Sequence, residues 1–91
     1  MKNKPSKIMP LRMAEKLRQI RTSTGLSQEG FAGRIKNQHT RISITRSNIS
    51  DYELGRREPP VLVLLAYARL ANVFSDVLVD DALDLPSIVA E

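Results

Sequence analysis

Two segments in the middle of the chain decide its fold, because each of them begins a short helix with a polar residue. They are Gly25-Leu26-Ser27-Gln28 and Arg46-Ser47-Asn48-Ile49-Ser50-Asp51-Tyr52-Glu53-Leu54-Gly55-Arg56-Arg57-Glu58-Pro59. Ser27 is a typical N-cap, and so is Thr45 immediately before the second segment. The second pattern ends at Gly55 and two arginines follow at once. The sequence therefore predicts two short helices, the second with a polar start and a basic loop behind it.

The flanking sequence predicts further helices, so the expected fold class is all-α. Apolar residues recur at helical spacing in residues 11–24, 28–35, 46–54, 61–71 and a short stretch after Ser75. In the first three stretches the expected inward positions are Met13, Ala14, Leu17, Ile20, Phe31, Ala32, Ile35, Ile49 and Tyr52. Glu53 follows Ile49 by one turn, so it also lies nearly inward and needs a cation. Residues 61–71 are the most apolar, and we expect the fourth helix to be the buried central one, through Val61, Leu62, Leu64, Leu65, Ala68, Leu70 and Ala71. Lys16 and Arg18 fall off the apolar face of the first helix. Gly25 and Asn72 suit the left-handed conformation that ends many helices.

Residues 36–44 are the least regular part of the pattern. Asn37 to Thr40 have loop composition, and Arg41 to Thr45 alternate as a strand would. Because a single strand has nothing to pair with, we expect an extended loop here. Alternatively, the second helix runs on as far as Asn37 or His39.

The charge is distributed unevenly along the chain. The net charge is +4 over 91 residues, yet residues 1–60 hold 13 of the 14 basic residues and five acids, which gives +8. Residues 61–91 hold one basic residue and five acids, which gives −4. We divide the chain into a flexible basic arm (1–10), a helical domain (11–79) and an acidic C-terminal tail (80–91). A basic first part favours a polyanionic partner such as nucleic acid.

Composition argues against several other classes of protein. The chain has no cysteine and a single histidine, His39, so zinc sites built from Cys or paired His are excluded. No segment approaches the ~20 apolar residues of a membrane span, and we expect a cytoplasmic protein. No nucleophile has a histidine and an acid near it in a catalytic motif, and no glycine-rich phosphate loop is present. We therefore expect neither an enzyme, nor a cofactor, nor a metal site.

Several spaced blocks together resemble one known family. They are Leu17-Arg18-x-x-Arg21, Gly25-Leu26-Ser27-Gln28-x-x-Phe31-Ala32, Ile49-Ser50-x-Tyr52-Glu53-x-Gly55-x-Arg57-x-Pro59 and the Leu65 to Leu78 pattern. The chain resembles the phage Cro/C1 repressor-like helix-turn-helix family, also called Xre-type regulators, over roughly residues 11–79. The resemblance implies a five-helix bundle that binds double-stranded operator DNA, usually as a homodimer. The expected function is a sequence-specific transcriptional regulator, with repression as the expected outcome.

The resemblance also implies roles for individual residues. Residues 45–54 correspond to the recognition helix, whose outward positions contact base edges: Thr45, Arg46, Ser47 and Asp51. Phosphate contacts are expected from Gln28, Asn48, Arg56, Arg57 and, in the insertion, Arg41. Arg21 and Glu53 match a family ion pair between the first and third helices. For Asp51, pairing with a neighbouring side chain is the alternative to a base contact.

The chain departs from the family between Ile35 and Thr45, where it has about seven additional residues and Ser43 in place of the usual turn glycine. Two other functions remain open from the sequence. One is a protein-interaction module, such as an antitoxin, that binds a partner through the acidic tail, residues 80–91; in the homodimer, the contact is expected from the tail residues Leu83, Leu85, Ile88 and Val89. The other is a helical bundle without a nucleic-acid role.

Overall fold

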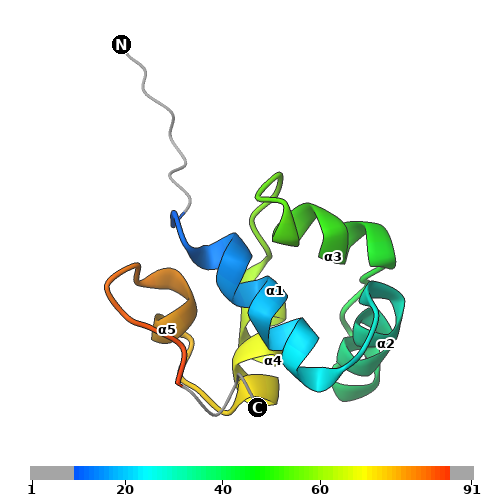
Figure 1. Cartoon of the computed structure of the whole chain (residues 1–91). Coiled ribbons are helices and arrows are strands. Elements are labelled where there is room, and N and C mark those ends of the chain that lie inside the picture. Colours follow the sequence, from blue (N-terminus) through cyan, green and yellow to red (C-terminus); the bar gives the residue numbers. More distant parts are fainter. Residues whose placement is uncertain (1–9, 87–91) are drawn as a thin grey trace.

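The computed structural model describes residues 10–86 and contains five helices and no strand over that range. They are α1 (Met13–Thr24), α2 (Gln28–Gln38), α3 (Arg46–Glu53), α4 (Val61–Ala71) and α5 (Asp76–Val79). Figure 1 shows α1 across the middle of the bundle, with α2 and α3 to one side of it and α5 to the other. None of the helices in residues 10–86 has the length and hydropathy needed to cross a membrane. The predicted all-α fold is confirmed, and the basic arm lies outside the described residues except for Pro10.

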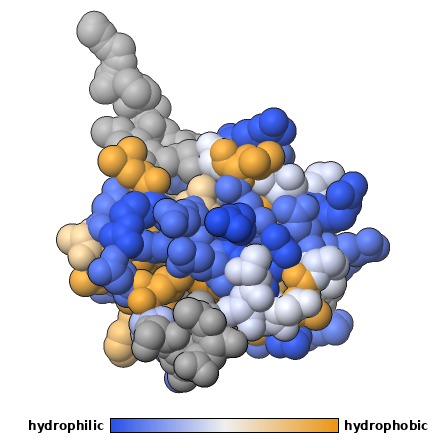
Figure 2. All heavy atoms as spheres, viewed as in Figure 1, coloured by the Kyte–Doolittle hydropathy of each residue, from blue (hydrophilic) through white to orange (hydrophobic). Residues whose placement is uncertain are grey.

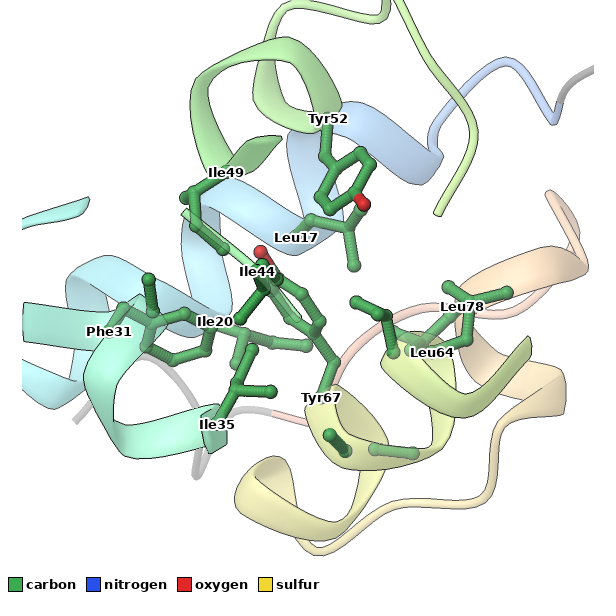
Figure 3. Close-up of a cluster of buried hydrophobic side chains, with 14 of the residues drawn as sticks. Leu17, Ile20, Phe31, Ile35, Ile44, Ile49, Tyr52, Leu64, Tyr67 and Leu78 are labelled. Atoms are coloured by element: carbon green, nitrogen blue, oxygen red, sulfur yellow. The ribbon is translucent and has the colours of Figure 1, made fainter. Parts of the chain in front are cut away.

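The core lies where α1, α2, α3 and α4 meet. Phe31 from α2 and Tyr67 from α4 pack with ring centroids 4.9 Å apart, and both are fully buried. Figure 3 shows these rings among aliphatic side chains from the other helices and from the loop before α3. The predicted inward positions of α1 to α3 are buried, with Ala14 half-buried; the buried ones are Met13, Leu17, Ile20, Phe31, Ala32, Ile35, Ile49 and Tyr52.

The helix ends largely follow the predicted caps. The Ser27 hydroxyl accepts a hydrogen bond from the Gly30 N–H, and Gly25 and Asn72 adopt the left-handed conformation at φ 77° and φ 59°. The alternative of a longer second helix is correct, because α2 ends at Gln38. Ser75 precedes α5 but makes no capping hydrogen bond, since its backbone is already helical rather than extended.

The loop between α2 and α3 begins with a turn, in which the Ile42 N–H donates a hydrogen bond to the His39 carbonyl at 2.9 Å. The expectation of an extended loop is therefore wrong at Thr40 and Arg41, whereas the burial of the residues that follow matches the alternation of the sequence. Ile42 and Ile44 are buried in the core, whereas Arg41 and Ser43 are exposed. A period of two places alternate side chains on opposite sides of an extended backbone, whether or not a strand partner exists. The loop therefore contributes to the core while its polar side faces solvent.

The prediction for α4 was wrong in part. Val61 and Leu62 in its first turn are 73% and 54% exposed, although we expected them to be buried. The buried side of α4 instead uses Val63, Ala66 and Tyr67 together with the expected Leu64 and Ala68, because only one face of this helix lies against α1 and α2. When a helix is apolar on all sides, its sequence does not show which face other helices will cover.

The predicted position of Lys16 was also wrong, because its side chain is 2% exposed. The Lys16 ammonium donates hydrogen bonds to three backbone carbonyls, at 2.7 Å to Val77, 3.0 Å to Asp80 and 2.7 Å to Leu83. These carbonyls belong to α5 and the residues that follow it. A lysine has three donors, so this ammonium is fully satisfied although it is buried.

The start of α1 is held by the same C-terminal residues. The Asp81 carboxylate accepts hydrogen bonds from the Leu11 and Arg12 N–H groups at 2.9 and 3.0 Å, and Arg12 forms an ion pair with Asp84. Asp81 thus caps a helix that has no side-chain cap of its own and that begins at Met13 instead of Leu11. We call Arg12, Lys16, Asp81 and Asp84 the C-terminal contact. It places part of the predicted acidic tail against α1; residues 87–91, with Ile88 and Val89, lie outside the described residues.

Candidate nucleic-acid interface

The first turn of α3 is fixed by two reciprocal hydrogen bonds. The Thr45 hydroxyl accepts from the Asn48 N–H at 3.3 Å, and the Asn48 side-chain oxygen accepts from the Thr45 N–H at 2.9 Å. This capping box satisfies two N–H groups that a helix start leaves without partners. Arg46 and Ser47, the next two residues, are both exposed.

The opposite face of α3 is anchored in the core. Ile49 is fully buried and Tyr52 is 7% exposed, so the helix cannot rotate about its axis without exposing apolar surface. Figure 3 shows both side chains directed from α3 toward α1 and α4. The cap and this anchor together hold Arg46 and Ser47 in a defined, outward orientation.

A partly buried network joins the end of α3 to α1 and α2. The Arg21 Nε and Nη2 atoms donate to the two Glu53 carboxylate oxygens at 2.6 and 3.1 Å, and the Gln28 amide donates to Glu53 Oε1 at 3.1 Å. Arg21 also donates to the Leu26 carbonyl at 2.9 Å. The hydrogen bond to Glu53 is the main cause that raises the pKa of the Arg21 guanidinium. The predicted Arg21–Glu53 pair is present, and Gln28 joins it; we call these three residues the Glu53 network.

A tight turn follows α3 and presents the two adjacent arginines. Gly55 adopts φ 76°, and the N–H groups of Arg56 and Arg57 both donate to the Asp51 carbonyl, at 2.9 and 3.4 Å. Both arginine side chains are exposed. The Arg56 guanidinium lies 4.0 Å from the Asp51 carboxylate, so Asp51 has a cationic neighbour, which favours the alternative role considered for it.

Some of the candidate residues are less available than the sequence suggests. The Thr45 hydroxyl and the Asn48 amide oxygen are engaged in the capping box. Arg41 is exposed, but it borders a different hollow from Arg46, together with His39, Ile42 and Leu62. The structure therefore groups Arg46 and Ser47 at one end of α3 and Gln28, Arg56 and Arg57 around its other end.

Lys36 belongs to the 36–44 insertion, and sequence reasoning assigned it no contact of its own. A hollow of about 410 Å³ lies between α2 and the start of α3, bordered by Glu29, Ala32, Gly33, Lys36, Ile44, Thr45 and Arg46. Lys36 follows Ala32 by one helical turn, so the spacing places both on the side of α2 that faces α3. Because the partner helix was not known to lie there, the sequence alone did not connect Lys36 to Arg46.

A surface that contacts nucleic acid is expected to be polar. Figure 2 shows hydrophilic residues over most of the face that α1 and α3 present in that view, with smaller apolar areas at its margins. Within residues 10–86 no cluster of three or more His, Cys, Asp or Glu side chains could hold a metal ion.

Comparison with known families agrees with this geometry. A family model described as a helix-turn-helix domain matches residues 12–82, which include all five helices. The chain therefore belongs to the helix-turn-helix domain family, and membership indicates a DNA-binding regulator. No curated protein and no solved structure matches the chain.

Proposed function

We propose that this chain is a sequence-specific transcriptional repressor of the Cro/C1 (Xre) type, with residues 45–54 as the recognition helix. The observation that carries the proposal is the fixed first turn of α3, where the capping box and the buried Ile49 and Tyr52 leave Arg46 and Ser47 exposed. A helix presented in this way suits the major groove of DNA. A bound repressor acts by excluding RNA polymerase from the DNA. This mode of action needs no catalytic group and no cofactor.

Within this proposal the candidate contact residues divide into two groups. Arg46 contacts guanine through two parallel hydrogen bonds, and Ser47 bonds to a neighbouring base edge. Gln28, Arg56 and Arg57 contact phosphates and set the register of the protein on the duplex. Gln28 is suited to this role because its bond to Glu53 fixes its side chain at the start of α2.

We further propose that the chain acts as a homodimer in the cytoplasm. A recognition helix of eight residues reaches few base pairs, so a second copy on the next half-site, about 34 Å away, doubles the sequence that is read. The competing function, a module that binds a partner protein through the acidic tail, has less support. Asp81 and Asp84 are already engaged by the chain's own α1.

The proposal is tested by selecting bound sequences from a random duplex pool and then comparing two variants. Arg46→Ala should reduce the preference for the selected site over random DNA by about 1–3 kcal/mol, because a base contact is lost. Arg57→Ala should weaken binding to both kinds of DNA alike, because a phosphate contact is lost. Gel-shift titrations at fixed salt measure both effects, and a two-fold symmetric selected motif supports the dimer.

The refuting outcomes are equally specific. If Arg46→Ala weakens binding to selected and random duplexes to the same extent, Arg46 does not contact bases. If the wild-type chain binds no duplex at low salt, the DNA-binding function itself is wrong, and co-purification of a protein partner bound by the tail then identifies the alternative.

A further inference from the structure

Gly33 is a glycine that the folded chain does not require. It lies inside α2 with an ordinary negative φ, and a Cβ atom built on it has no heavy atom within 4 Å beyond its chain neighbours and its own helix backbone. Glycine in a helix interior costs about 1 kcal/mol relative to alanine. By contrast, a Cβ on Gly30 in the same helix contacts Ser27 and Leu26 at 3.4 to 3.7 Å. Neither packing nor backbone conformation accounts for glycine at residue 33.

The open space above Gly33 belongs to the hollow between α2 and α3. Lys36 borders this hollow from the α2 side and Arg46 from the α3 side, and Ala32 and Ile44 contribute small or buried apolar side chains. Within residues 10–86 neither Lys36 nor Arg46 forms an ion pair. Two exposed cations thus face a space that a side chain at residue 33 would partly fill.

We propose that this hollow seats one strand of the DNA duplex, with Lys36 binding a backbone phosphate while Arg46, on the opposite side, contacts the bases. The inference rests on the proposed function and adds a phosphate contact supplied by the extended second helix. Gly33 serves it by letting the strand approach the backbone of α2 closely. A phosphodiester at this place meets the ammonium of Lys36 next to the turn that contacts the bases.

Glu29 borders the same hollow, and the proposal predicts that loss of its charge affects DNA binding in the opposite direction from loss of the Lys36 charge. It precedes Lys36 by seven residues on α2, which corresponds to a rise of about 10 Å along the helix axis. A carboxylate there repels the phosphates that approach the Glu29 end of the hollow. Removing this charge should therefore strengthen DNA binding, whereas removing the Lys36 charge weakens it.

The test measures DNA binding as a function of salt for the full chain and for matched variants. Lys36→Gln should make the slope of log affinity against log salt less steep by about one, because one fewer counterion is released. Arg34→Gln removes an exposed charge from the same helix outside the hollow and should leave the slope unchanged. Glu29→Gln should bind more tightly than wild type at every salt concentration.

A second measurement separates the open space from the charge. Gly33→Ala and Gly33→Leu should both raise the melting temperature, because both residues favour helix over glycine. Both variants should weaken DNA binding, Gly33→Leu more than Gly33→Ala, because the longer side chain fills more of the hollow. A more stable protein that binds less well cannot be explained by loss of folding.

The outcomes distinguish this inference from the function on which it rests. Absence of duplex binding by the wild-type chain overturns the DNA-binding function and the inference together. If the wild type binds and Lys36→Gln has the same slope as Arg34→Gln, or Gly33→Leu binds like the wild type, the hollow does not seat a strand while the proposed function stands.

Discussion

Helix α1 carries an ionic contact near each end, and the two contacts differ in what they bind and in how deeply they are buried. Near its C-terminal end, Arg21 pairs with the carboxylate of Glu53, and the two side chains are 16% and 4% exposed. Near its N-terminal end, the buried Lys16 binds three backbone carbonyls, while the Arg12–Asp84 pair beside it is 42% and 76% exposed. One contact orients the candidate recognition helix, and the other attaches the C-terminal segment.

From this difference we expect burial, more than the number of charges, to set the strength of such contacts. Water screens the exposed Arg12–Asp84 pair, so it contributes little to stability. The Glu53 carboxylate is shielded from water and depends on Arg21 and Gln28 for its hydrogen bonds. Removal of one partner there leaves a buried charge without compensation. The predictions below test this contrast, from the largest expected effect to the smallest.

Replacement of the acid in the Glu53 network should have the largest effect. Glu53→Ala should lower the free energy of unfolding by about 3 kcal/mol, because Arg21 then remains partly buried without its carboxylate. Urea unfolding followed by circular dichroism measures the change, with Glu15→Ala, an exposed acid on α1, as the control. A loss no greater than that of the control would show that the network is not a stabilising contact.

Replacement of the buried Lys16 should have the second-largest effect on stability. Lys16→Met keeps the length of the side chain but removes the ammonium, so three carbonyls lose their donor and stability should fall by about 2 kcal/mol. Amide hydrogen exchange of residues 77–84 should accelerate selectively, because these residues lose their attachment to α1. The control is Arg18→Met, an exposed site on the same helix. Unchanged exchange in residues 77–84 would contradict the attachment role.

Removal of a buried hydroxyl close to the Glu53 network should instead increase the stability of the protein. The Tyr67 hydroxyl is buried and has no hydrogen-bond partner within residues 10–86. Its pKa is raised mainly by burial and further by the negative charge of Glu53. Tyr67→Phe should therefore raise the free energy of unfolding by about 1 kcal/mol, since an unsatisfied polar group is removed without loss of the ring. Thermal unfolding measures it; a lower melting temperature would imply that the hydroxyl has a partner.

The two carboxylates of the C-terminal contact, Asp81 and Asp84, should make the stability of the protein depend on pH in the acid range. Hydrogen bonds from the backbone N–H groups of Arg12 and Leu11 lower the pKa of Asp81, and the hydrogen bond from the Arg12 side chain lowers the pKa of Asp84. A carboxyl with a lowered folded pKa favours the folded state above its unfolded pKa of ~4 and loses this contribution as pH falls through the folded pKa. The wild type should thus lose more stability below about pH 4 than an Asp81→Asn, Asp84→Asn variant. Equal losses in urea titrations would contradict this prediction.

Much of the fold was predictable because its signals are local. The Ser27 and Thr45 caps, the left-handed Gly25 and Asn72, and the inward faces of α1 to α3 follow from residues within one or two turns of each other. The Arg21–Glu53 pair was found by resemblance and by the inward position of an acid that needs a cation. These features depend on helix periodicity and capping chemistry, which a sequence displays directly.

The parts that sequence reasoning missed depend on partners far away in the chain. Lys16 binds carbonyls 61 to 67 residues later, and backbone carbonyls leave no signature in a sequence. The exposed first turn of α4 and the link between Lys36 and Arg46 likewise depend on which helix faces are covered. The sequence by itself determined five helices, several of their caps and a basic first part. Only the tertiary structure decided which polar groups were buried together and which cations border the hollow beside α3, because these follow from helix packing and not from helix formation.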